Sequence, residues 1–368
     1  MRRKLLGLTL ALSLAIASLT GCGKSAETTA ETTAVTEAAS EAQTSEASSE
    51  TTEASTDTTE ASSETTEAVT ADTAALISED RSGNPITVPA EVNKIVSMAP
   101  SVTRTLIDLG LADKIVAIDT NSYDYVEFLP TGIAQFDMMN PDNESLVALE
   151  PDIIFTSGMS SKGGEDVFKA SREAGVCVAD IPSSTSFDQI AEDILFIGAC
   201  TGTSDKADEI VKEFKVGTET LKSAAAEAAN GETKTVLFMI SLPTSDYPTL
   251  YSTGSNTYID EMITDLGCKN VVGDQNSWVS ISVEDAVALN PDVIFTNVNY
   301  VDNPVEEIAA TPGWENVTAV KNNDIYYIDA NTSNQPNQHV LEALFEMAKY
   351  LYPEYFKDVE FSDLENAA

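Results

Sequence analysis

The chain has 368 residues, of which 60 are acidic and 20 basic, so its formal net charge is −40 at pH 7. Such an acidic chain is a poor candidate for nucleic-acid binding, which depends on lysine and arginine. It contains a single histidine. Most hydrolase mechanisms therefore lack their general base, and a site for bare zinc or manganese lacks its usual ligands. We expect no catalytic residues, no metal site and no nucleic-acid partner.

Residues 1–21 have the organisation of a lipoprotein signal peptide. Three basic residues (2–4) precede an apolar run (5–19) that is too short to form a stable membrane span. The run ends at Leu19-Thr20-Gly21-Cys22, which resembles a bacterial lipoprotein cleavage box. We expect lipidation of Cys22, so that the protein is anchored at the extracytoplasmic face of the bacterial cell membrane. A plain secretory signal is the alternative.

Residues 22–75 form a second compositional segment, in which Ser, Thr, Ala and Glu dominate. From Ser25 to Ala75 there is no lysine, arginine or aromatic residue. Such a segment buries too little apolar surface to offset its ordering entropy, and its like charges repel one another. We expect a disordered acidic tether between the membrane anchor and the folded part of the chain.

Residues 76–203 read as an N-terminal α/β lobe. Short apolar runs alternate with helical patterns, which is typical of a parallel, doubly wound sheet. The pattern predicts strands at 94–98, 115–119, 153–155 and 176–180, with helices at 101–109 and 165–174.

Two segments, 144–157 and 284–297, match at Glu, Val, Ala, Leu, Pro, Asp, Ile, Phe and Thr. We interpret them as an internal duplication, one copy in each of two similar lobes. Each copy reads as a short helix, a proline that ends it, and a strand buried on both faces. In the second copy, Ser282 and Asp285 have the spacing of a capping box.

The repeated pattern Glu-x-x-x-Ala-Leu-x-Pro-Asp resembles that of the substrate-binding proteins of cobalamin and iron-siderophore ABC importers. Further matches extend the resemblance from about residue 80 to residue 356; they are 95–101, 109–116, 266–271, 325–329 and 352–356. It implies a monomeric receptor that captures a metal chelate and delivers it to an ABC transporter permease dimer. In that family one glutamate per lobe docks onto permease arginines, and Glu144 and Glu284 occupy those positions. An enzyme would not need two matched exposed carboxylates.

The resemblance also implies that one long helix joins the lobes, and we place it at 204–229. Apolar residues at helical spacing and the scarcity of helix breakers agree with this. Residues 230–368 then form the C-terminal lobe, with strands at 235–241, 293–295 and 324–329 and helices at 258–266 and 339–350. The expected fold class is α/β, with two Rossmann-like lobes, mostly parallel sheets and a ligand cleft between the lobes.

Aromatic side chains are the candidate ligand contacts, because ligands of open α/β sheets bind beyond the carboxyl ends of strands. We place Tyr123, Tyr125 and Phe136 on such loops in the first lobe, and Tyr251 and Trp278, with Tyr247, in the second. The resemblance favours Trp278, because the family often has an aromatic residue just before the docking glutamate. Core packing is the alternative for each.

Arg104 is a further candidate ligand residue. We expect Ser101 to cap the helix, and the family usually has Glu three residues later, which completes a capping box. This chain has Arg104 there, against the helix dipole, and such a locally unfavourable choice indicates a functional role. The alternative is a solvated arginine paired with Asp108, four residues on.

The remaining reactive side chains give weaker signals. Cys177, Cys200 and Cys268 match no zinc or redox spacing, and Cys177 and Cys200 lie in apolar segments typical of buried residues. His339, at the start of the last predicted helix, reads as a capping or surface residue, or as a contact for a bound chelate.

We therefore expect an extracytoplasmic substrate-binding lipoprotein with no intrinsic cofactor. Outside the signal peptide its only arginines are Arg81, Arg104 and Arg172, so a strongly anionic catecholate siderophore would find few partners. A near-neutral corrinoid such as cobalamin, or a hydroxamate ferric siderophore, fits better. The opposing hypothesis is an enzyme or cell-surface adhesion module on the same bilobal fold.

Overall fold

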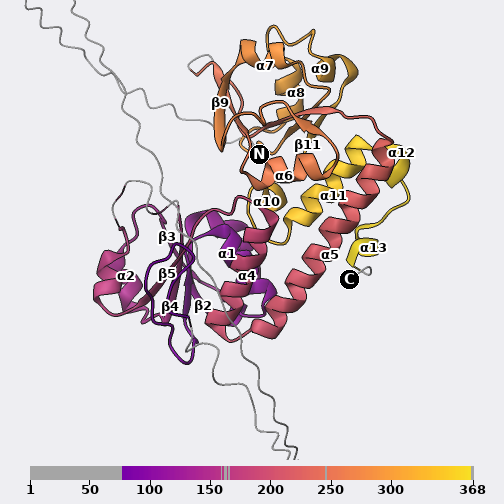
Figure 1. Cartoon of the computed structure of the whole chain (residues 1–368). Helices are drawn as coiled ribbons and strands as arrows, with labels where there is room; N and C mark the ends of the chain where they lie inside the picture. Colours follow the sequence, from indigo (N-terminus) through magenta and orange to yellow (C-terminus); the bar gives the residue numbers. More distant parts are fainter. Residues whose placement is uncertain (1–76, 159, 161–163, 165, 245–246, 366–368) are drawn as a thin grey trace, which may run out of the picture. The chain divides into compact units, whose positions relative to one another are not determined.

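The computed structural model describes residues 77–158, 160, 164, 166–244 and 247–365, which belong to one compact unit (Figure 1). The predicted signal peptide, Cys22 and the tether lie outside these residues. Within them, no helix combines the length and apolar character needed to cross a bilayer.

The first lobe contains a five-stranded, fully parallel sheet in the order β3-β2-β1-β4-β5. The strands are β1 (Ile95–Ser97), β2 (Ile115–Asp119), β3 (Ala134–Phe136), β4 (Ile153–Ser157) and β5 (Cys177–Ile181). The helices are α1 (Pro100–Asp108), η2 (Ala112–Lys114), η3 (Thr120–Phe128), α2 (Asn143–Ala148), α3 (Lys169–Glu173) and α4 (Phe187–Thr201). Strands β1 and β4 are buried along almost their whole length, as the apolar runs predict for central parallel strands.

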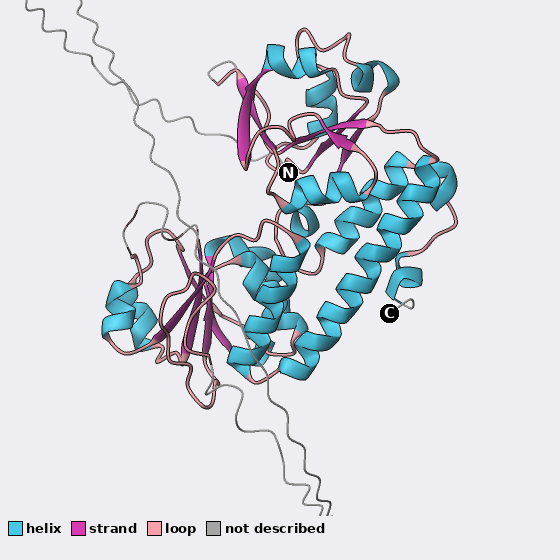
Figure 2. Ribbon diagram, viewed as in Figure 1, coloured by secondary structure: helices cyan, strands magenta, loops and turns pink. Residues whose placement is uncertain are grey.

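The second lobe contains a mixed sheet in the order β11-β10-β6-β7-β9, with β8 pairing β6. Figure 2 shows the strands in magenta and the helices in cyan. The strands are β6 (Thr235–Met239), β7 (Thr249–Thr253), β8 (Lys269–Asn270), β9 (Trp278–Ser282), β10 (Val293–Thr296) and β11 (Ile325–Tyr327). The helices are α6 (Tyr258–Asp265), α7 (Val283–Leu289), α8 (Pro304–Ala309), α9 (Thr318–Asn322), α10 (Ala330–Ser333), α11 (Val340–Leu351), α12 (Pro353–Phe356) and α13 (Phe361–Glu365). Two sheets, one parallel and one mixed, confirm the predicted α/β class.

Strands β7 and β9 were not expected, because the sequence prediction placed these residues on loops. They pair antiparallel with each other, and β7 also pairs antiparallel with β6. Exposed and buried side chains alternate over the first four residues of each strand, which is the period-two pattern of a sheet covered on one face only. Thr253, at the end of β7, is buried as well.

Helix α5 (Ser204–Ala229) follows the first sheet and precedes the second, over the range predicted for the linking helix. It packs against α4 of the first lobe and against α11 of the second. Two glycines permit these contacts. A Cβ atom at Gly198 would lie 2.4 Å from Ala207 Cβ, and one at Gly217 would lie 2.4 Å from Leu341 Cδ2. The helix axes therefore approach more closely than larger residues would allow.

All three described cysteines are free and buried, as expected for Cys177 and Cys200. Burial raises the pKa of the Cys177 and Cys268 thiols to about 11. The thiolate is the reactive form of cysteine, so these side chains act as small apolar residues.

The duplicated segments have the same local structure in both lobes. The carboxylate of Asp152 accepts hydrogen bonds from the backbone N–H groups of Asn93 and Lys94, just before β1. The carboxylate of Asp292 accepts one from the N–H group of Thr235, the first residue of β6. In each lobe the Pro-Asp step thus ties the start of one central strand to the start of its neighbour.

The residue before each proline has a left-handed conformation, with φ of 52° at Glu150 and 44° at Asn290. Asparagine tolerates this region better than glutamate, for which it costs roughly 1–2 kcal/mol. The only ion pair of Glu150 among the described residues is an exposed one with Lys94, which contributes little.

We therefore expect Glu150→Asn to raise the free energy of unfolding by about 1 kcal/mol, measured by urea denaturation. The reciprocal change Asn290→Glu should lower it by a similar amount. Equal stability of both variants and the parent would show that the left-handed residue carries no strain.

Candidate functional site

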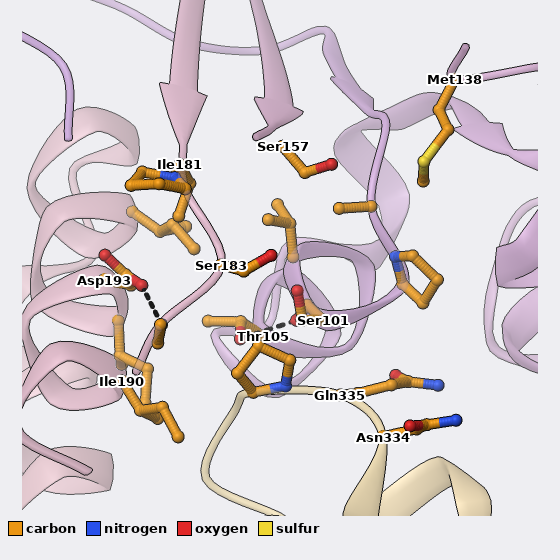
Figure 3. A pocket seen from close by; sticks show the side chains of 18 residues that line it. Ser101, Thr105, Met138, Ser157, Ile181, Ser183, Ile190, Asp193, Asn334 and Gln335 are labelled. Atoms are coloured by element: carbon orange, nitrogen blue, oxygen red, sulfur yellow. Dashed lines mark hydrogen bonds between the residues drawn. The ribbon is translucent and has the colours of Figure 1, made fainter. Parts of the chain in front are cut away.

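A cavity of about 160 Å³ lies at the carboxyl ends of β1, β4 and β5 (Figure 3). This is the edge of an open α/β sheet at which ligands bind. Its lining combines apolar side chains with hydroxyl and amide groups, and the second lobe contributes the segment 334–336. The polar lining residues include Ser101, Thr105, Ser157, Ser183, Ser184, Asp193, Asn334 and Gln335.

The one charged group in the cavity wall already has partners. Asp193 accepts hydrogen bonds from Ser184 Oγ at 2.5 Å and from Arg81 Nε at 2.6 Å, and burial raises the pKa of its carboxyl group. No lysine or arginine of the described chain lines the cavity. Ser157 Oγ is buried there without a hydrogen-bond partner. The cavity therefore suits neutral polar groups better than a strong anion.

None of the six predicted ligand residues lines this cavity. The sequence prediction did not include the serines or Asp193. A buried carboxylate within helix α4 gives no recognisable pattern in the sequence. The serines follow strand ends, so their position at the carboxyl edge of the sheet was the available signal.

Of the first-lobe aromatics, Tyr125 reaches the second lobe. Its hydroxyl donates a hydrogen bond to Gln335 Oε1 at 2.5 Å, and burial raises its pKa to about 12. Tyr123 is exposed, as a ligand contact requires. Phe136 was expected on a loop, but it is the last residue of β3 and packs partly against the core.

A buried hydrogen-bond network holds η3, the 3₁₀ helix that carries both tyrosines. Asp119 caps η3 by accepting a hydrogen bond from the N–H group of Asn121, and it also accepts one from the Ser122 hydroxyl. The Ser122 hydroxyl contacts Thr103 Oγ1, which contacts Ser97 Oγ. Burial raises the pKa of the Asp119 carboxyl group. These hydrogen bonds therefore hold in place the backbone that carries Tyr123 and Tyr125.

The second-lobe aromatics lie on strands, which corrects their predicted position on loops. Tyr251 is in β7 and Trp278 begins β9, and their side chains are 51% and 47% exposed. The register pairs Tyr251 with Ser280 and Thr253 with Trp278, which makes the two aromatic residues diagonal neighbours on one face. Leu250 and Ile281 point to the opposite, buried face. Tyr251 and Trp278 thus form an exposed aromatic surface.

Arg104 pairs with Asp108, which is the alternative that the sequence left open. Its Nε atom lies 3.0 Å from Asp108 Oδ2 and 2.8 Å from His339 Nε2. The predicted Ser101 cap is wrong, because Ala99 occupies the N-cap position and Pro100 begins α1. Proline suits the first helical position, since its fixed φ is helical and it has no N–H group to leave unpaired.

This helix start determines the stability expected for Arg104→Glu. A glutamate cannot complete a capping box with Ser101, and it would place a second carboxylate beside Asp108. We expect the free energy of unfolding to fall by about 1–3 kcal/mol, because Asp108 loses its cationic partner in a half-buried site. Thermal unfolding at neutral pH measures this, and a gain in stability would contradict the observed helix start. A ligand role for Arg104 stays a prediction.

The two predicted docking glutamates occupy equivalent places. Glu144 lies in the first turn of α2, which Asp142 caps, and Glu284 lies in the first turn of α7, which Ser282 caps by accepting a hydrogen bond from the N–H group of Asp285. Both glutamates are exposed. No ion pair within the described residues involves either one. Each carboxylate is therefore available to a partner, near the favourable end of a helix dipole.

Most of the chain is similar in sequence to proteins of one family. Residues 95–332 match the model of the periplasmic binding protein family. The chain is 30% identical over 283 residues to an uncharacterized ABC transporter substrate-binding lipoprotein, YvrC of Bacillus subtilis, covering 76% of this chain and 86% of that one. It is 24% identical over 280 residues to a cobalamin-binding protein of Halobacterium salinarum, covering 73% and 72%.

Among solved structures, the molybdate-binding protein MolA of Haemophilus influenzae superposes with a TM-score of 0.65 at 21% identity, covering 77% of this chain and 94% of that one. This similarity supports the bilobal fold.

The chain belongs to the periplasmic binding protein family. It is the substrate-binding component of an ABC transporter, a non-enzymatic protein whose partners are a permease and a small-molecule ligand. The hypothesis of an enzyme on the same fold is therefore wrong. No group of three or more His, Cys, Asp or Glu side chains in the described part of the chain is placed to hold a metal ion.

Proposed function

We propose that this binding protein carries a near-neutral metal chelate, with a corrinoid such as cobalamin as the first candidate and a ferric siderophore of the hydroxamate type as the second. The observation that carries the proposal is that the arginine side chains already form ion pairs. Arg81, Arg104 and Arg172, the three in the described residues, are each paired with a carboxylate. An anionic ligand would have to displace one of those carboxylates.

The size of the cavity agrees with this choice. Pockets that enclose a whole drug-sized ligand measure roughly 300–1,000 Å³, whereas the cavity beside Ser157 measures about 160 Å³. It can receive one side group of a large chelate, and its serine and amide lining matches an amide such as those on the rim of a corrinoid. The macrocycle itself would lie outside the cavity.

The exposed aromatic side chains supply the second element of the proposed site. Tyr123 in the first lobe and Tyr251 and Trp278 in the second are each at least 47% exposed. Exposed tyrosine and tryptophan contribute large contact areas to binding at a small cost in side-chain entropy. A flat, largely apolar macrocycle is the kind of ligand that such side chains contact. Phe136 and Tyr125, which are more buried, would support the wall of the site.

Delivery completes the proposed function. Glu144 and Glu284 would dock onto the permease, one from each lobe, and Cys22 would carry the lipid that holds the protein on the extracytoplasmic side of the membrane. The cobalamin-binding relative from Halobacterium salinarum favours the corrinoid. The molybdate-bound structural neighbour favours an oxyanion, and a solution test must separate the two.

The test uses the full chain and four probes: hydroxocobalamin, a ferric hydroxamate siderophore, haem and ferric citrate. After gel filtration, the visible absorbance of the protein peak reports a bound chelate, and molybdate is tested separately by calorimetry. We expect hydroxocobalamin to co-elute with the protein, or else the hydroxamate. Binding of ferric citrate or molybdate alone would overturn the proposal that the ligand is near-neutral.

A further inference from the structure

The single histidine of the chain lies where the two lobes meet. His339 precedes α11 in the second lobe, and its side chain is 20% exposed. Its Nε2 atom lies 2.7 Å from Asp108 Oδ2, at the end of α1 in the first lobe. Its Nδ1 atom lies 2.6 Å from Glu342 Oε1, one turn into α11. The imidazole thus joins a carboxylate of one lobe to a carboxylate of the other.

Asp108 is the centre of this cluster. Its Oδ2 atom accepts hydrogen bonds from Arg104 Nε at 3.0 Å and from Gln338 Nε2 at 2.5 Å, in addition to the contact with His339. Gln338 and His339 come from the second lobe, so two of the three donors cross between the lobes. The hydrogen bond from Tyr125 to Gln335 also crosses between the lobes, and it involves no group that titrates near neutral pH. A further one runs from the N–H group of Phe187 in α4 to Glu261 Oε2 in α6, at 2.7 Å.

The contacts of Nε2 differ between the two protonation states of the ring. An imidazolium donates from both nitrogens, so Nε2–H bonds to Asp108 and Nδ1–H bonds to Glu342. The neutral ring that keeps its proton on Nδ1 still donates to Glu342, but Nε2 then becomes an acceptor. In that state the donor within reach is Arg104 Nε, at 2.8 Å. When the ring loses its Nε2 proton, His339 therefore no longer donates a hydrogen bond to Asp108.

Other charged groups face the same cluster. Lys206 and Glu213 of α5 share a small cavity with Asp108, His339 and Glu342. Asp124 of η3 lies near the ring of Tyr125, over which the Arg104 guanidinium is placed. The charges of Lys206 and Arg104 oppose protonation of His339, whereas the carboxylates of Asp108, Glu213 and Glu342 favour it.

We propose that His339 is a pH-sensitive latch between the lobes, which holds the first lobe through a charge-assisted hydrogen bond to Asp108 when its ring is protonated and loosens that hold when the ring becomes neutral. The hydrogen bonds from Gln338 to Asp108 and from Arg104 to the ring still join the lobes in the neutral state, so deprotonation weakens the contact rather than breaking it. The latch does not depend on the identity of the transported ligand. All of its contacts lie within this chain.

The direction of the pH effect follows from linkage. Burial lowers the pKa of His339, but the hydrogen bonds with Asp108 and Glu342 outweigh burial and raise it above the ordinary value of 6.5. A raised pKa means that the folded protein binds the proton more tightly than the unfolded chain. The stabilising contact is therefore complete below about pH 6.5 and is lost as the pH rises through the higher pKa of the folded state.

The first test is an NMR titration of the full chain, in which one histidine gives one imidazole Cε1–H signal. We expect a pKa above 6.5 in the parent protein. Asp108→Asn should lower it by about 1 unit, and Arg104→Gln should raise it, because the Arg104 charge opposes protonation. An imidazole pKa at or below 6.5, or an unchanged pKa in Asp108→Asn, would overturn the latch.

The second test measures the separation of the lobes. Spin labels are placed on Asp113→Cys in the first lobe and Asn322→Cys in the second, which are both exposed, in a full chain that also carries Cys22→Ser. The three native cysteines of the described chain are buried and should not be labelled. Double electron–electron resonance at pH 5.5 and pH 8.5 then gives the distribution of distances. We expect the distribution to broaden or lengthen at the higher pH.

Two variants test whether the pH response of the distance distribution comes from His339. His339→Gln keeps a hydrogen-bond donor but cannot titrate, so its distance distribution should be the same at both pH values. Tyr125→Phe removes an inter-lobe hydrogen bond in which His339 takes no part, so it should loosen the lobes equally at both pH values and keep the pH response. A parent protein without a pH response, or a response that persists in His339→Gln, would show that His339 is a structural residue only.

Discussion

Reversing both docking carboxylates, by Glu144→Arg with Glu284→Arg, is expected to weaken binding to the permease by at least about a hundredfold, or about 2.7 kcal/mol. Each glutamate is exposed and has no ion pair among the described residues, so its charge is available to a basic partner. The reversal would place like charges opposite each other at both lobes, which costs several kcal/mol across an interface. Binding to the permease dimer in lipid nanodiscs, with ligand affinity measured in parallel, gives the result.

The control must carry the same change in charge away from the proposed interface. Glu91→Arg with Glu315→Arg does so, because Glu91 precedes β1 and Glu315 precedes α9, whereas Glu144 and Glu284 begin helices that lead away from the carboxyl edges of the sheets. Ligand affinity should be unchanged in both double variants. If the control pair weakens permease binding as much as the docking pair, the effect is one of net charge and the docking assignment is wrong.

The two tryptophans of the chain should respond to truncation in opposite ways. Trp314 is fully buried in the second-lobe core, and Trp314→Ala is expected to lower the free energy of unfolding by about 3–5 kcal/mol. Trp278 is 47% exposed, so Trp278→Ala should change stability by less than about 1 kcal/mol. It should instead weaken binding of the chelate that co-elutes with the protein by at least about tenfold.

Urea denaturation and ligand titration of both variants check this prediction. A loss of stability in Trp278→Ala comparable to that in Trp314→Ala would assign Trp278 to the core. Unchanged affinity in Trp278→Ala, together with unchanged stability, would remove Trp278 from the binding surface. Loss of binding in Trp314→Ala is informative only if the variant is folded at the temperature of the titration.

The parts of the fold that the sequence predicted are those with strong local patterns. The apolar runs at 153–155 and 293–295 became central strands, because residues buried on both faces of a parallel sheet leave a continuous hydrophobic signal. The capping pair Ser282 and Asp285 formed as its spacing indicated. Strands β7 and β9 were missed because alternating polar residues resemble a loop when their pairing partner is unknown.

The candidate site was harder to predict because its residues meet only through tertiary contacts. Gln335 and Tyr125 are 210 positions apart, and the hydrogen bond between them has no signature in either segment. The role of His339 depends on Asp108, which is 231 positions away. The start of α1 was misplaced for a different reason, since Ser101 is a good capping residue and Pro100 an equally good first helical residue. The helix begins at Pro100 because the proline ring fixes φ at a helical value, and this places the N-cap at Ala99 rather than at Ser101.

The close packing of α5 has a kinetic consequence. Gly198 and Gly217 bring the helices of both lobes against this one element, so we expect the lobes to tilt about it rather than to swing freely apart. Spontaneous escape of a ligand held between them must wait for a rare wide opening, and the residence time on the free protein should be long. We therefore expect docking to the permease to drive the separation of the lobes. Release of the ligand should then depend on the strength of that docking.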